Sequence, residues 1–225
     1  MSYFPRYGMP RTTIARRDWF SDWEGALREV ASPEFDPTTS YRHSACTFLH
    51  HVVAFCAFNL GPGWYRVFRA AIEAGAAVNA RDALGYTVLH YLADKATSLF
   101  VSSFDQCWNL LRWVTALVAA GASPSILAPK SDKYRNTETP DMVTPSQFLH
   151  CFPLNDHFVH PTIDVAAEFD HAVAMGLVQR AEAAARCEDA VTAYFVLQAA
   201  MRTDGVPPPP NVVVGALAAL RLDGS

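Results

Sequence analysis

Apolar residues recur at helical spacing in two long stretches of the chain. They are Trp64, Phe68, Ala71 and Ile72 in the first stretch, and Leu110, Leu111, Val114, Leu117 and Val118 in the second. Positions three and four residues apart share one face of an α-helix, so each stretch predicts a helix packed on one side. A glycine follows each stripe, Gly75 in "AAIEAGAAVNA" and Gly121 in "ALVAAGASPS". Because glycine readily adopts the left-handed conformation that ends many helices, we expect positive φ at both.

Three short motifs have the chemistry of a helix start. Thr-x-x-His occurs at residues 47–50 ("TFLH") and 87–90 ("TVLH"), and a related "TPSQ" lies at residues 144–147. A threonine hydroxyl can accept a hydrogen bond from the first turn of a helix, and a polar side chain three residues later can reach back to it. In the third motif Pro145 falls at the first helical position, where its missing N–H costs nothing.

The order of these features predicts repeated helix pairs. A Thr-x-x-His helix is followed by an apolar helix, Gly-Ala, a short extended segment, an Asp-x-x-Gly turn and the next Thr-x-x-His helix. This order resembles the ankyrin repeat, with its Gly-Ala-Asp-Val-Asn and Asp-x-x-Gly-x-Thr-Pro-Leu-His segments. The matching residues are Gly75, Ala76, Val78, Asn79, Asp82, Gly85, Thr87, Leu89 and His90. The resemblance implies an all-α fold, an ankyrin-type solenoid of helix pairs with short hairpin-like fingers.

The chain departs from the family pattern in spacing. Ankyrin repeats recur at about 33 residues, whereas the three motifs begin at Thr47, Thr87 and Thr144. We therefore expect insertions at residues 59–63, 96–104 and 128–141, the last a polar loop that forms either an enlarged finger or an insertion without a partner. The proline that usually follows the threonine is replaced by Phe48 and Val88.

The flanking segments predict caps for the array. Residues 12–31 carry Trp19, Phe20, Trp23, Leu27 and Val30 on one side, which indicates an N-terminal capping helix. Two helices are expected at residues 163–175 and 177–201, as a helical C-terminal cap or a degenerate repeat. A proline-rich linker then leads to an apolar tail. The predicted organisation is an arm and cap at 1–40, repeats at 41–161 (41–80, 81–127 and 138–161 onward), a helical cap at 162–203 and a tail at 204–225.

Composition excludes several classes of protein. The 225 residues are 51% hydrophobic, with a formal net charge of −4. Four arginines and no acid lie in residues 1–17, so the rest of the chain carries −8, which argues against a nucleic-acid partner. The longest apolar stretch, residues 52–60, is far shorter than the roughly 18 residues of a membrane span, so no membrane association is expected. Five cysteines in apolar contexts favour reduced thiols and an intracellular location, cytoplasmic or nuclear.

Candidate reactive groups favour structural interpretations. Cys46, His50, His51 and Cys56 are four nominal zinc ligands, but on a helix positions 51 and 56 point away from the face shared by 46 and 50. His50 and His90 follow a capping threonine, which predicts hydrogen bonding rather than catalysis. No nucleophile elbow or phosphate-binding loop is present in the sequence. We therefore expect neither enzymatic activity nor a metal or other cofactor.

The resemblance implies a protein-binding surface on the concave side of the array. Its candidate residues are His51 and Phe55 in the first unit, Tyr91, Asp94 and Lys95 in the second, and Arg81, Leu84 and Tyr86 on the finger between them. Tyr86 and Tyr91 are expected to be exposed, unless Tyr91 packs beneath residues 96–104. The expected function is a non-catalytic scaffold or adaptor that binds a protein partner. The alternative is a structural subunit of a larger assembly. The sequence does not indicate the oligomeric state.

Overall fold

The computed structural model describes residues 22–40, 45–56, 62–99, 104–129, 141–150 and 164–186. These residues are mostly helical, as the sequence predicts, with one small antiparallel sheet. The helices are α1 (Trp23–Val30), α2 (Phe48–Cys56), α3 (Pro62–Glu73), α4 (Val88–Leu99), α5 (Phe104–Ala119), α6 (Pro145–His150) and α7 (Val165–Arg186), and the strands are β1 (Ala128–Pro129) and β2 (Met142–Val143).

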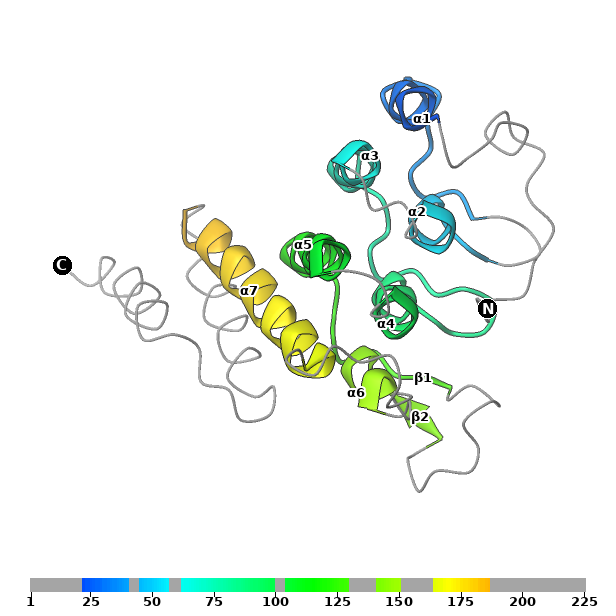
Figure 1. Ribbon diagram of the computed structural model, residues 1–225. Coiled ribbons are helices and arrows are strands. Elements are labelled where there is room, and N and C mark those ends of the chain that lie inside the picture. The colour runs from blue at the N-terminus through cyan, green and yellow to red at the C-terminus, as the bar shows by residue number, and fades with distance from the viewer. Residues whose placement is uncertain are drawn as a thin grey trace.

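The helices form two layers (Figure 1). Helices α2, α4 and α6 follow one another in one layer, and α1, α3 and α5 follow one another in the other. Contacts between the layers join α2 to α3, α4 to α5 and α6 to α7, so consecutive helices pack as pairs. Helix α7 runs along α5 at the C-terminal side of the described stack.

The two predicted helix ends are confirmed. Gly75 has φ +92° and Gly121 has φ +104°. At the first end the amide of Gly75 donates to the carbonyl of Ile72 at 2.9 Å, and that of Ala76 donates to Ala71 at 3.1 Å. Corresponding bonds of 2.9 and 3.1 Å close the end of α5. This pattern is the Schellman motif, which satisfies carbonyls that the helix leaves without partners.

The sheet differs from the expected loop at residues 128–141. Ala128 pairs with Val143 and Pro129 with Met142, so the two ends of that segment form an antiparallel ladder. Ala128 and Val143 are fully buried, while the other pair faces outward. Burial of one face explains why this register forms in a segment whose composition predicts a loop. Residues 130–140 lie outside the described residues.

Aromatic side chains fill the contact between α3 and α5. The rings of Phe68 and Trp113, both almost fully buried, lie 4.5 Å apart between centroids. Toward the surface, the Arg112 guanidinium lies 4.6 Å from the centre of the Tyr65 ring. Phe68 belongs to the apolar stripe that predicted α3, whereas Trp113 lies outside the stripe that predicted α5, whose Val118 packs against α7.

The expected pair of helices after residue 162 is wrong in one respect. Helix α7 continues without a break from Val165 to Arg186, through Gly176. A Cβ atom at Gly176 would lie 2.6 Å from Cβ of Val118 and 2.7 Å from the carbonyl oxygen of Thr115. Gly176 therefore permits close packing of α7 on α5 and does not end a helix.

Several expectations concern residues outside the described ranges. Of the predicted capping helix, residues 23–30 form α1, whose N-cap Asp22 accepts a hydrogen bond from the amide of Gly25 at 2.8 Å. Residues 1–21, the helix end expected at residue 201 and the tail at 204–225 lie outside. No helix in the described part of the chain is both long and apolar enough to cross a membrane.

Candidate interaction surface

Each Thr-x-x-His motif ties the start of its helix to the next helix pair. The amide of Thr47 donates to Nδ1 of His50 at 3.1 Å, and the Thr47 hydroxyl lies 2.9 Å from the same nitrogen. On the other side of the ring, Nε2 of His50 lies 3.2 Å from the carbonyl oxygen of Tyr86, the residue before Thr87. His50 therefore links one motif to the next.

The second motif repeats this geometry. The amide of Thr87 donates to Nδ1 of His90 at 3.2 Å, with the Thr87 hydroxyl at 2.9 Å. Nε2 of His90 lies 3.2 Å from the carbonyl oxygen of Val143, the residue before Thr144. The equivalent contact spans 36 residues from His50 and 53 from His90. Extra chain in the second unit is thus accommodated without loss of the junction.

These contacts determine which ring nitrogen carries the proton. Because a backbone amide donates to Nδ1, that nitrogen is an acceptor, and Nε2–H is the donor to the carbonyl oxygen. Burial lowers the pKa of His50 below its usual value and lowers the pKa of His90 to about 4. Both rings are therefore neutral at pH 7 and serve as structural links, consistent with the interpretation drawn from their spacing.

The third motif makes the same cap without a histidine. The amide of Thr144 donates to Oε1 of Gln147 at 3.0 Å, and the amide of Gln147 donates to the Thr144 hydroxyl at 3.2 Å. This reciprocal pair is a capping box at the start of α6. Glutamine thus supplies the acceptor that His50 and His90 supply in the other two units.

A buried carboxylate organises the chain reversal between α3 and α4. Oδ1 of Asp82 accepts from the amides of Leu84 at 2.9 Å and Tyr86 at 2.8 Å, and Oδ2 accepts from the Tyr91 hydroxyl at 2.9 Å. Gly85 completes the turn with φ +89°. The Tyr91 oxygen also lies 3.5 Å from Sγ of Cys46. Since the hydroxyl proton goes to Asp82, the thiol is the donor in this contact.

The expected exposure of the two tyrosines is wrong. Tyr86 is 6% exposed and Tyr91 is 4% exposed. The Tyr86 ring packs against His90 and Phe148, with centroid distances of 5.8 and 6.0 Å, and the Tyr91 ring packs edge-on against His50 at 5.0 Å. Burial raises the pKa of Tyr91 far above its ordinary value. Each ring therefore lies in a junction between two helix pairs and does not face solvent.

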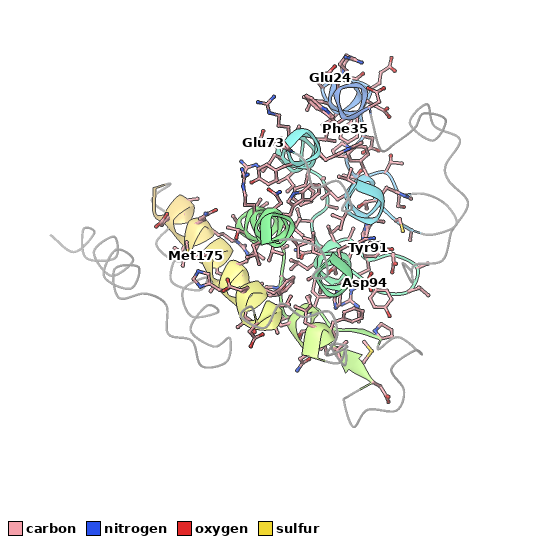
Figure 2. The ribbon with its side chains drawn as sticks, in the orientation of Figure 1. Glu24, Phe35, Glu73, Tyr91, Asp94 and Met175 are labelled. Carbon is pink, nitrogen blue, oxygen red and sulfur yellow. The ribbon has the colours of Figure 1, made fainter. Side chains whose placement is uncertain are left out.

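The other expected residues of the concave side are also buried. His51 is 8% exposed, Asp94 is 9% exposed and Lys95 is fully buried. Figure 2 places Asp94 and Tyr91 on α4 in the middle of the stack, whereas Glu24 lies on α1 at its edge. Burial lowers the pKa of Lys95, and the nearby Asp94 carboxylate opposes this shift. The side chain of Phe55 lies outside the described residues.

Two of the predicted binding residues remain accessible. Arg81 is exposed and Leu84 is 41% exposed. Nη1 of Arg81 donates to the carbonyl oxygen of Leu127 at 3.2 Å, which joins this finger to the segment before β1. A Cβ at Gly85 would lie 3.3 Å from Cδ of Pro129, so the turn that carries Leu84 abuts β1.

These contacts bring exposed apolar side chains from two fingers together. Among the described residues, the exposed large apolar side chains are Leu84, Leu127 and Met142, with 41, 44 and 41% of their surface accessible. Pro129, which pairs with Met142, is exposed as well. We call Arg81, Leu84, Leu127, Pro129 and Met142 the fingertip strip.

Three residues of the fingertip strip were not predicted from the sequence. Leu127, Pro129 and Met142 lie in or beside the segment that was expected to be a polar loop. The available signal was the contrast between the apolar pairs at its two ends, Leu127-Ala128 and Met142-Val143, and the polar residues between them. An alternation of exposed and buried residues at both ends is typical of a short two-stranded ladder.

Within the described ranges, no group of three or more histidine, cysteine, aspartate or glutamate side chains is placed to hold a metal ion. Comparison of the chain with protein-family models, curated proteins and solved structures finds no match.

Proposed function

We propose that the chain is a divergent ankyrin-type array that binds a partner protein, without catalysis, through the fingertip strip. The observation that supports this proposal is the gathering of Leu84, Leu127 and Met142 beside Arg81 on neighbouring fingers. Exposed apolar side chains that gather in one patch can mark an interaction surface, and arginine is enriched among the side chains that dominate binding energy. The expected concave residues contribute less, because most of them are buried.

The composition of the strip indicates the chemistry of the partner. Arg81 carries the positive charge, and the carboxylate of its neighbour Asp82 is buried and already accepts from two amides and a hydroxyl. A complementary surface would present apolar side chains and at least one carboxylate to Arg81. We therefore propose a protein segment that combines apolar and acidic residues.

Site-specific photocrosslinking tests where the partner binds. A benzophenone side chain is placed at Leu84 in one variant and at Arg66, an exposed position on α3, in another. Both are expressed in the native host and the crosslinked products are identified. We expect position 84 to give a discrete crosslinked partner that position 66 does not capture. Equal capture by both variants would contradict the proposed surface.

Affinity measurements with the purified partner complete the test. Arg81→Ala and Leu84→Ala are each expected to weaken binding by about 1 to 3 kcal/mol without a change in melting temperature. Arg66→Ala serves as the matched control and should bind like the wild type. Light scattering after size-exclusion chromatography distinguishes the alternative, because a structural subunit would form a stoichiometric oligomer. Unchanged affinity in a folded Arg81→Ala, Leu84→Ala double variant would move the binding site elsewhere.

A further inference from the structure

His50 and His90 are links that require an unprotonated ring. In each, Nδ1 accepts from a threonine amide while Nε2–H donates to a carbonyl oxygen of the next unit. An imidazolium ion has two donors and no acceptor. Protonation of either ring would therefore point an N–H at a backbone N–H and break the cap while the ring is fully buried.

The third motif shows that the cap itself has no need of a titratable group. Gln147 accepts from the Thr144 amide at 3.0 Å, as the histidines do in their own motifs. A glutamine amide keeps its acceptor at every pH at which the protein folds. The chain therefore contains two caps whose acceptor is titratable and one of the same design whose acceptor is not.

The carbonyl groups held by the two histidines belong to neighbours of the fingertip strip. His50 holds Tyr86, two residues after Leu84, and His90 holds Val143, which directly follows Met142. Loss of these bonds would remove one anchor from each finger and leave the Asp82 turn and the Ala128–Val143 ladder as the remaining anchors. Two buried, titratable rings are thus bonded to backbone groups next to the exposed apolar side chains.

We propose that acid uncouples consecutive helix pairs at His50 and His90 and so disperses the fingertip strip. Release of a bound protein on acidification follows from this and rests on the proposed function. The uncoupling itself concerns the protein alone. At neutral pH both links are formed and the strip is intact, and as the medium becomes acidic the open form, in which the rings are solvated and charged, gains population.

The charges that face the two rings act in both directions. The Asp82 carboxylate favours the protonated form of each ring, and at His90 the charges of Arg81 and His50 oppose it. The Tyr91 ring packs against His50, and burial raises its pKa, so it carries no charge near neutral pH. The Tyr86 ring packs against His90. Burial outweighs these charges, with the result that His90 has a pKa of about 4 when linked and a usual value of 6.5 when open.

Hydrogen exchange measures the opening directly. Amides of residues 84–91 and 142–148 are followed at pH 7.5 and pH 5.0 and corrected for the intrinsic pH dependence of exchange. The difference between 6.5 and about 4 at His90 corresponds to an opening constant about 30-fold larger at pH 5.0 than at pH 7.5. His50→Gln and His90→Gln, which copy the natural cap at Gln147, should each remove the response at their own junction.

A third buried histidine supplies the control. Burial also lowers the pKa of His51 to about 4, whereas the threonine cap and the link to the next unit are made by its neighbour His50. His51→Gln should therefore keep the acid response at both junctions. An undiminished response in the His50→Gln, His90→Gln double variant would overturn the proposal and assign the response to other groups.

A measurement on the wild type covers the case in which the variants do not fold. Nitrogen chemical shifts of the two rings at pH 7.5 should show Nε2–H and an unprotonated Nδ1, and a proton on Nδ1 would overturn the proposal. Failure of the proposed function is distinguishable. A chain that opens in acid but is not crosslinked at position 84 contradicts the binding surface and supports the junctions.

Discussion

Two glycines of this chain, one at a helix end and one inside a helix, are required for different physical reasons. Gly75 has φ +92°, and a Cβ atom placed on it would meet nothing within 4 Å. Gly176 lies inside α7, where an added Cβ would come within 2.7 Å of the Thr115 carbonyl oxygen and even nearer to Val118. The backbone conformation requires glycine at the first position, whereas a neighbouring helix requires it at the second.

Gly75→Val tests the conformational requirement alone. A β-branched residue at positive φ is strained, so we expect the free energy of unfolding to fall by about 1 to 3 kcal/mol. Denaturation in urea measures this loss. Ala74→Val, at the exposed preceding position, is the control and should change stability by less than about 0.5 kcal/mol. A wild-type midpoint in the Gly75 variant would contradict the positive φ.

Gly176→Ala tests the steric requirement. Helix propensity by itself predicts a gain of about 1 kcal/mol, whereas overpacking against α5 predicts a loss of about 1 to 3 kcal/mol. We expect the loss to be larger, because backbone at Thr115 limits how far the helices can move apart. The reverse exchange at an exposed position of α7, Ala183→Gly, should cost about 1 kcal/mol. A stabilised Gly176 variant would show that α7 does not pack on α5 as described.

The contrast between these glycines shows what sequence reveals at the residue scale. The end of α3 is determined within a few residues, by an apolar stripe followed by Gly75, so it could be predicted. The environment of Gly176 depends on Val118, which is distant in sequence and adjacent only after folding. A glycine with helical residues on both sides therefore gave the same local signal as a helix end.

Among the elements, the reversal before α4 depends on one carboxylate. Asp82→Ala would leave the Tyr86 amide and the Tyr91 hydroxyl without the acceptor they now share, at a cost of about 2 to 4 kcal/mol. Tyr91→Phe removes one of these bonds and should cost about 1 kcal/mol. In a double-mutant cycle we expect a coupling of about 1 kcal/mol between the two positions, whereas additive losses would mean that the 2.9 Å contact contributes nothing.

Helix α4 shows where prediction by element reaches its limit. Its start at Thr87 and His90 followed from local capping chemistry and was predicted. The burial of Tyr91, Asp94 and Lys95 was not, because polar residues in a helix ordinarily indicate a solvent-facing side. That side of α4 is instead covered after folding, and no periodicity within the helix records this. Of the candidate binding residues on the turn, Arg81 and Leu84 are exposed, whereas Tyr86 is buried.

At the scale of the whole molecule, acid should lower stability in a defined pH range. The pKa of His90 is about 4 in the folded chain against 6.5 for the ordinary side chain, so the unfolded chain binds the proton more tightly. The contribution of His90 to the free energy of unfolding is complete above pH 6.5 and is lost as the pH falls toward 4. For His90 alone the loss amounts to about 3 kcal/mol. Urea denaturation at intervals between pH 7.5 and 4 measures this slope.

An exposed carboxylate titrates in a separate range. Hydrogen bonds from Thr38 and Thr39 lower the pKa of Asp36 from 3.8 to about 2, so its contribution is present above pH 3.8 and is lost only at lower pH. The slope above pH 4 therefore reports on groups other than Asp36. In His90→Gln this slope should decrease, and an unchanged slope would show that folding does not lower the pKa of His90.

The ladder at Ala128 and Val143 should allow extra chain to be inserted between its two strands. It holds side by side two points of the chain whose separation is not fixed by the junctions, since His50 and His90 make the same contact across 36 and 53 residues. Once the ends of a loop are held, doubling its length costs only about 0.6 kcal/mol. A fluorescent domain inserted between Pro129 and Met142 should therefore leave the helical stack folded. It would lie next to the fingertip strip and could report on partner binding.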